Sequence, residues 1–135
     1  MKLEGGCYCG QLRYVAEGEP IMKAQCHCRE CQYISGGSAN VLIGMPAAGF
    51  SYTKGEPKSF SRTDLANPAA REFCPNCGTH VLTRSPGLPG AVIIKVGTLD
   101  DPAVYGMPNI AIQTADKQVF QIIPEGVATF ERFPV

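Results

Sequence analysis

The chain has 135 residues, enough for one domain of ordinary size and too few for two. Hydrophobic residues make up 44% of the chain and charged residues 18%, which is too apolar a composition for a disordered segment. Twelve basic and twelve acidic side chains cancel, and this balance argues against a nucleic-acid partner held by its phosphates.

Short apolar runs separated by turn residues recur along the sequence. We expect extended segments, in chain order, at 11–18, 21–26, 38–45, 50–55, 58–63, 79–85, 91–99, 109–115, 118–123 and 126–133. The Gly-Glu-Pro turn at 55–57 predicts that the segments on either side of it pair with each other. Two short helical segments are expected, a helix at 29–34 and a single turn near 64–70. Alternation with period two, β-branched residues and closely spaced turns favour a mainly β fold.

No apolar run reaches the roughly 18 residues of a membrane span. The N-terminal sequence MKLEGGCYCGQL lacks the apolar core of a secretory signal. We therefore expect a single domain over residues 1–135, located in the cytoplasm and without a membrane partner.

Seven cysteines lie in three short groups, CYC at 7–9, CHCREC at 26–31 and CPNC at 74–77. An odd number without an export signal fits a disulfide framework poorly. The short spacings suit a metal ion instead, because two or three thiolates from one turn converge on a single point. Soft sulfur ligands favour zinc over magnesium or calcium.

The cysteines divide most economically into two sets. CYC and CPNC together form what we call the cysteine quartet: Cys7, Cys9, Cys74 and Cys77. CHCREC forms the cysteine trio: Cys26, Cys28 and Cys31. Four protein ligands make a closed structural zinc site, whereas three with a vacant position are the arrangement of a catalytic zinc. This division uses every cysteine, while the alternative, CPNC with two cysteines of the trio, leaves CYC without a partner.

Two histidines offer a further alternative, in which both zinc sites are structural. His27 or His80 would then be the fourth ligand of the second site. His27 lies between two proposed ligands, and in extended backbone its side chain points away from theirs. His80 follows Cys77 by three positions and fits an ordinary strand residue equally well. We expect thiols alone in both sites, with one position of the second site open.

Four pieces of the sequence resemble the glutathione-dependent formaldehyde-activating enzyme family, whose fold is the zinc-bearing β-tent. They are GGCYCGQLRY at 5–14, CHCRECQYISGG at 26–37, REFCPNCGTHVLTRS at 71–85 and KVGTLDDP at 95–102. A lone CPNCG is common among zinc proteins, but the four pieces in this order are specific.

The resemblance implies a mainly β fold of the β-tent type, with several coiled antiparallel sheets around a structural zinc on the quartet. It places the trio at the active centre, where the spacing argument predicts a second zinc with an open position; we expect two zinc sites per chain, the second only partly occupied. It also implies a carbon–sulfur lyase, which joins a thiol to an aldehyde as in S-(hydroxymethyl)glutathione. Glutathione is then the co-substrate, the partners are a small-molecule thiol and aldehyde, and a homo-oligomer is compatible with the sequence. The alternative is a non-catalytic binding or chaperone-like module of the same fold.

Other residues around the motifs are candidates for the substrate or for the proton. Arg71 and Arg84 could bind a glutathione carboxylate. Tyr33, Ser35 and Ser38 follow the trio and could face it.

The last third of the chain departs from the family pattern. Relatives often carry a His and, nine residues later, a Trp, where this sequence has Ala111 and Phe120. The substitution at 111 removes an imidazole as a candidate acid–base or binding group.

Overall fold

The computed structural model describes residues 1–134 and shows a mainly β protein, as expected from the sequence, with one short α-helix and four short 3-10 helices among these residues. The helical turn expected near 64–70 is wrong, because this segment forms bends and irregular chain that lead into a strand. The helix α1 spans Arg29–Ile34, the range expected from the sequence. The strands are β1 Lys2–Gly6, β2 Arg13–Glu17, β3 Met22–Cys26, β4 Asn40–Pro46, β5 Phe50–Lys54, β6 Lys58–Phe60, β7 Ala70–Phe73, β8 His80–Arg84, β9 Ala91–Lys95, β10 Ile110–Ile112 and β11 Ala128–Thr129.

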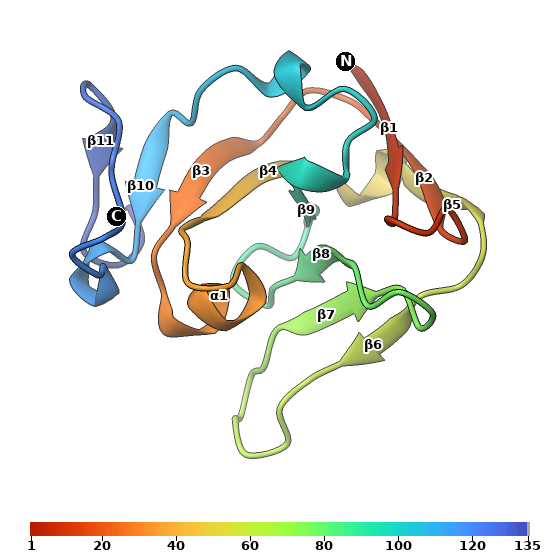
Figure 1. Cartoon of the computed structure of the whole chain (residues 1–135), viewed down its shortest axis with the longest axis horizontal. Helices are drawn as coiled ribbons and strands as arrows, with labels where there is room; N and C mark the ends of the chain where they lie inside the picture. Colours follow the sequence, from red (N-terminus) through yellow and green to blue (C-terminus); the bar gives the residue numbers. More distant parts are fainter. Residues whose placement is uncertain (135) are drawn as a thin grey trace.

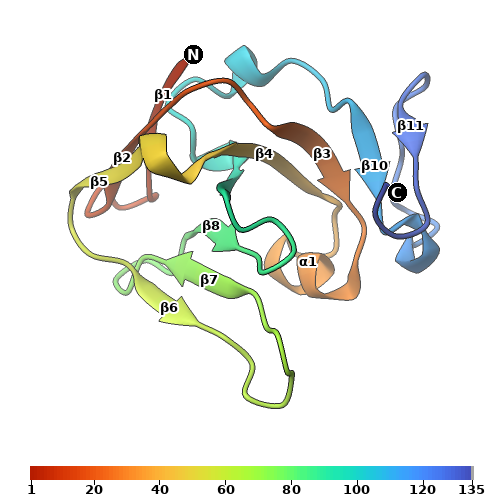
Figure 2. The same cartoon turned by 180° about the vertical axis from the view of Figure 1, so that it is seen from behind.

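The strands form two sheets. The smaller has three strands in the order β1-β2-β5, and the larger has eight in the order β11-β10-β3-β4-β9-β8-β7-β6. The pairs are antiparallel, except that β10 lies parallel to β3 and to β11. Figure 1 and the reverse view in Figure 2 place the small sheet at one end of the molecule and β10 and β11 at the other.

The main hydrophobic core lies between the two sheets. Strands of the small sheet contribute Leu3, Tyr14 and Ala16, and the central strands β4 and β9 contribute Ile43 and Ile94, all almost completely buried. A second, smaller core lies on the other face of β3 and β4, where α1 covers the sheet and β10 extends it beside β3. The second core contains two of the trio cysteines, so the trio belongs to a buried layer of its own.

The expected pairing across the turn at 55–57 is wrong. Strand β5 pairs with β2 in the small sheet, whereas β6 pairs with β7 in the large one. Aromatic packing explains the separation, because the Phe50 ring lies 5.5 Å from Tyr14 and 5.1 Å from Tyr52, measured between ring centroids. Burial of these rings favours β2 as the neighbour of β5 over the short exposed strand β6.

The expected strand at 118–123 does not form. Val119, Phe120 and Ile122 are exposed, whereas Gln121 between them is buried. The Gln121 amide donates to the carbonyl of Gly37, and its oxygen accepts from the Gln118 N–H. Hydrogen bonding of this polar side chain therefore overrides the apolar alternation in this segment. Strands β1 and β7, in contrast, form outside the expected segments, and the sequence KLEGG of β1 has little β propensity.

Candidate metal centre

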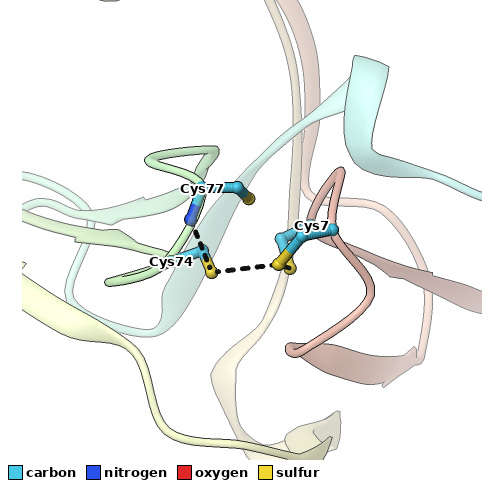
Figure 3. A group of neighbouring side chains, drawn as sticks. Cys7, Cys74 and Cys77 are labelled. Atoms are coloured by element: carbon cyan, nitrogen blue, oxygen red, sulfur yellow. Dashed lines mark hydrogen bonds between the residues drawn. The ribbon is translucent and has the colours of Figure 1, made fainter.

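The cysteine quartet assembles where the two sheets meet. Cys7 and Cys9 lie in the turn after β1, and Cys74 and Cys77 lie in the turn between β7 and β8. Figure 3 shows Cys7 facing Cys74 and Cys77. The four sulfurs all lie within 4.8 Å of one another. The Sγ atom of Cys9 is 3.6 Å from that of Cys7 and 3.7 Å from that of Cys74. Tetrahedral zinc with bonds of about 2.3 Å separates its sulfur ligands by about 3.8 Å, so the quartet fits this ion.

Local backbone geometry turns these thiols inward. Gly78 has φ +76°, a conformation that favours glycine, and its N–H donates to the Cys74 carbonyl over 2.9 Å. The N–H of Cys77 points at the Cys74 sulfur, 3.4 Å away, and the N–H of Leu12 donates to the Cys7 sulfur over 3.1 Å. Such N–H donors stabilise thiolates, the form that binds metal. The Thr79 side chain acts likewise and lowers the pKa of Cys77 to about 5.

The cysteine trio comes from one continuous segment. Cys26 ends β3, Cys28 is the N-cap residue of α1, and Cys31 lies in that helix. Their sulfurs also lie within 4.8 Å of one another. The Cys28 sulfur accepts from the N–H of Cys31 over 3.3 Å, which begins the helix and keeps both thiols in place. Cys26 and Cys31 are buried, and Cys28 is half-buried, so solvent reaches the trio from the side of Cys28.

The three trio thiols differ in acidity. Hydrogen bonds with Cys26 and Cys28 lower the pKa of the Cys31 thiol, whereas hydrogen bonds with Cys28 and Cys31 raise the pKa of Cys26. The Asn40 amide, 3.5 Å from the Cys31 sulfur, and the positive charge of Lys95 add to the lowering at Cys31. Cys31 is therefore the member of the trio best suited to carry a thiolate before any metal binds.

Strand register defines the face of the large sheet on which the trio lies. Residues directly opposite each other on neighbouring strands share a face, as do residues two positions apart on one strand. The pairings therefore place on one face, which we call the trio face, Cys26, Asn40, Leu42, Lys95, Ile93, Thr83 and Arg71. Glu30 of α1 forms an ion pair of 3.3 Å with Arg71, which ties the helix to this face.

Register also separates the two arginines proposed for a substrate carboxylate. Arg71 lies on the trio face, as that role requires. Arg84 lies on the opposite face. It is two positions after Leu82 on β8, and Leu82 pairs with Glu72, the neighbour of Arg71 on β7, so both lie on the face that Arg71 does not share. There the Arg84 guanidinium donates to the Glu72 carboxylate and lies 5.8 Å from the Phe50 ring. Arg84 therefore does not face the trio.

Neither histidine belongs to a cysteine group. His27 is completely buried, with Nδ1 3.0 Å from the Gln121 side-chain oxygen and Nε2 3.2 Å from that of Gln25. Both ring nitrogens thus face amide oxygens. The Nε2 atom of His80 is buried without a hydrogen-bond partner among residues 1–134. Burial, with the charges of Lys95 and Arg71, lowers the pKa of His80 to about 4.

The residues proposed for proton transfer are mostly engaged elsewhere. Tyr33 is 80% exposed, and the Arg29 guanidinium lies 5.1 Å from the centre of its ring. The Ser35 hydroxyl donates to the Cys31 carbonyl over 2.8 Å, where it ends the helix, and Ser38 is exposed. Among these three, only Ser35 contacts a trio residue, and it does so through the backbone.

The two positions that depart from the family pattern lie apart from the trio sulfurs. Ala111 is completely buried and pairs with Gln25, so it occupies the face of β3 opposite to Cys26. Phe120 is exposed and lies beside Gly37. Position 111 therefore supplies no imidazole, and Ala111 lies outside the trio face.

The fold and the thiol groups together define the class of this protein. It is a small, mainly β protein with two cysteine clusters that could hold zinc. The model of the family described as glutathione-dependent formaldehyde-activating enzyme matches residues 2–116. The chain belongs to this family, which confirms the resemblance drawn from the sequence.

The structure is similar to the crystal structure of a Rhodobacter sphaeroides protein solved as a structural genomics target. The TM-score is 0.61 at 19% sequence identity, over 80% of this chain and 97% of that chain. This likeness supports the fold alone. Comparison with curated proteins gives no match. Within residues 1–134, no helix has the length and apolar character needed to cross a membrane.

Sequence reasoning missed three polar residues of this region. Asn40 and Lys95 lie on the trio face, and Gln121 holds His27 from the other side. A signal existed for Lys95, which is the single charge in the apolar run AVIIK of β9. Nothing in the sequence marked Gln121, because its role depends on where a loop packs.

Proposed function

We propose that the protein is a zinc-dependent carbon–sulfur lyase that forms or cleaves an adduct of glutathione, or a related thiol, with an aldehyde. In this proposal the quartet holds a structural zinc, and the trio holds a second zinc with one open position. The observation that carries the proposal is the trio itself, in which three thiols converge and residues 1–134 supply no fourth side-chain ligand. Membership of a family of formaldehyde-activating enzymes supports the substrate class.

The reaction joins a thiol sulfur to the carbonyl carbon. A carbon–sulfur bond forms, the π electron pair of the carbonyl moves to its oxygen, and that oxygen takes a proton; cleavage reverses these steps. When bound, zinc would supply a Lewis acid that lowers the pKa of the incoming thiol.

The chain's own residues prepare the site for this reaction. Cys28, half-buried at the start of α1, leaves the trio accessible to a small molecule from one side. Asn40 and Lys95 stabilise negative charge on Cys31, and Arg71 is a second cation on the same face. Arg71 is 14% exposed and paired with Glu30, so a substrate carboxylate would have to compete with that pair.

The proposal treats residues 1–135 as one domain, because the two sheets share the main core. It makes a small-molecule thiol and aldehyde the partners and the cytoplasm the site of action. Zinc occupancy is expected to be higher at the quartet, which has four ligands, than at the trio, which has three.

One observation favours the alternative of a non-catalytic binding module. Three large apolar side chains in one loop are exposed: Val119 by 92%, Phe120 by 66% and Ile122 by 75%. Exposed apolar groups in sequence are typical of interaction surfaces. In a binding module these residues would be the functional ones, and the trio would have a structural role.

The test combines zinc stoichiometry with turnover of glutathione and small aldehydes, measured against the uncatalysed background. We expect two zinc ions per chain in the wild type, and one in Cys28→Ser together with loss of the acceleration. Serine is a preferred N-cap residue, so this variant should keep α1 and the fold, as circular dichroism can verify. Two zinc ions in the wild type without any acceleration would support the binding module instead. Turnover by Cys28→Ser at the wild-type rate would refute a catalytic trio.

A further inference from the structure

Lys95 is a buried cation whose charge has no carboxylate partner among residues 1–134. Only 8% of the residue is exposed. Its Nζ atom donates to the Thr83 hydroxyl over 3.0 Å, which satisfies one of three donors. Burial of a charge costs free energy unless an opposite charge compensates it, so we expect an anionic group close to Lys95.

The other charged groups of the trio face do not supply that anion. Arg71 is itself a cation, and the carboxylate of Glu30 on α1 is engaged with it. His80 stays neutral over the ordinary pH range, because its pKa is lowered. The groups on this face that can carry negative charge are the thiols of the trio.

Register places Lys95 close to these thiols. It lies directly opposite Leu42 on β4, and Leu42 packs in the same small core as Cys26 and Cys31. Asn40, two positions from Leu42 on the same face, reaches the Cys31 sulfur. Burial lowers the pKa of Lys95 to about 8, and the Cys31 thiolate opposes this shift.

Resting on the proposed function, we infer that Lys95 is the counter-charge of the trio and sets its preference for an anionic fourth ligand. Three thiolates around a divalent ion leave one net negative charge, which would repel an incoming thiolate. The lysine charge cancels that excess, so the open position can accept a thiolate from the substrate. Lys95 is thus a positioning residue for charge, and it makes no bond to the metal or the substrate.

The test measures metal and ligand binding in Lys95→Met, which keeps the length of the side chain and removes its charge. Cobalt(II) replaces zinc at both sites, and changes in its absorption spectrum when a ligand is added report the trio, because the quartet has no open position. At the effective dielectric of protein sites, one nearby charge changes the affinity for an anion by about tenfold. We therefore expect about tenfold weaker binding of metal at the trio and of glutathione thiolate to the cobalt-loaded protein. Binding of imidazole, a neutral ligand, to the same cobalt should change far less.

Two further variants separate charge from packing. Lys95→Arg keeps the charge and should restore most of the thiolate affinity. Lys23→Met removes one lysine from the opposite face of β3, where its Nζ atom donates to the Tyr105 carbonyl over 2.8 Å, and should bind thiolate as the wild type does. If Lys95→Met does not fold, Lys95→Gln, which keeps a donor for Thr83, takes its place.

The outcomes are distinct. A neutral variant that binds thiolate with wild-type affinity, or that loses thiolate and imidazole equally, overturns the role of Lys95 and leaves the proposed function standing. A wild-type protein that takes up no cobalt at the trio contradicts the second metal site, and with it the proposed function itself.

Discussion

Replacement of Cys9 by serine isolates the contribution of metal at the quartet. Cys9 is exposed, so its side chain adds little to packing, and its sulfur contacts are those of Cys7 at 3.6 Å and Cys74 at 3.7 Å. Without a metal ion, such an exposed substitution should change the free energy of unfolding by no more than about 0.5 kcal/mol.

With zinc bound, the expected loss is several times larger. Structural zinc sites contribute on the order of 10 kcal/mol or more, so removal of one ligand in four should cost about 3 kcal/mol. For a chain of this size that loss corresponds to a decrease in Tm of roughly 10 °C. Since domains are stable by only about 5–15 kcal/mol in total, the variant should be markedly destabilised.

The assay is urea and thermal unfolding in the presence of zinc, with and without a strong chelator. Tyr8→Ser is the matched control, because Tyr8 is 95% exposed in the same turn and is not a ligand. We expect Cys9→Ser to fall well below both the wild type and the control, and chelation to abolish most of the difference. If Cys9→Ser and Tyr8→Ser unfold within about 0.5 kcal/mol of each other in zinc, the quartet does not hold a structural metal.

Two further predictions concern residues outside the cysteine groups. The pKa of His80 is lowered from 6.5 to about 4, so the unfolded chain takes up a proton that the folded chain resists, and stability falls as the pH drops from 6.5 to 4. His80→Gln should flatten this fall, and denaturation at pH 5 and 7 would measure it; equal slopes contradict the assignment. Gly5→Ala places a methyl group against the Thr98 carbonyl and the Tyr14 ring, and overpacking of this kind costs about 1–3 kcal/mol. Gly97→Ala, which meets open space, is its control, and equal Tm values for the two would refute the contact argument.

The thiol groupings could be predicted because each rests on short-range geometry. Cys74 and Cys77 share one turn, and Cys26 and Cys28 lie on either side of one residue, so spacing alone brings each pair together. The assignment of CYC to CPNC used only the need for four ligands, and the structure brings those sulfurs within 4.8 Å. Strands β4 and β9 could also be predicted, since both are apolar runs bounded by turn residues.

Features that depend on strand pairing could not be predicted from the sequence. The face on which Arg71 or Arg84 lies follows from register, and neither residue's neighbours in the sequence specify it. The same holds for Lys95, whose position near the trio requires β4 to lie between β3 and β9. Gln121 illustrates a different reason why prediction from the sequence fails. The apolar residues on either side of it predicted a strand, but the buried hydrogen bond of its side chain determines the conformation of this segment.

Cys9 and Cys74 lie close in space although 65 positions separate them in the sequence, and this has a consequence for biosynthesis. During synthesis Cys7 and Cys9 emerge well before Cys74 and Cys77, so the four thiols can come together only after more than half of the chain has been made. During that interval the sulfurs of Cys7 and Cys9 are free to meet oxidants or other ions. We therefore expect assembly of the quartet to require surroundings that keep its thiols reduced during translation.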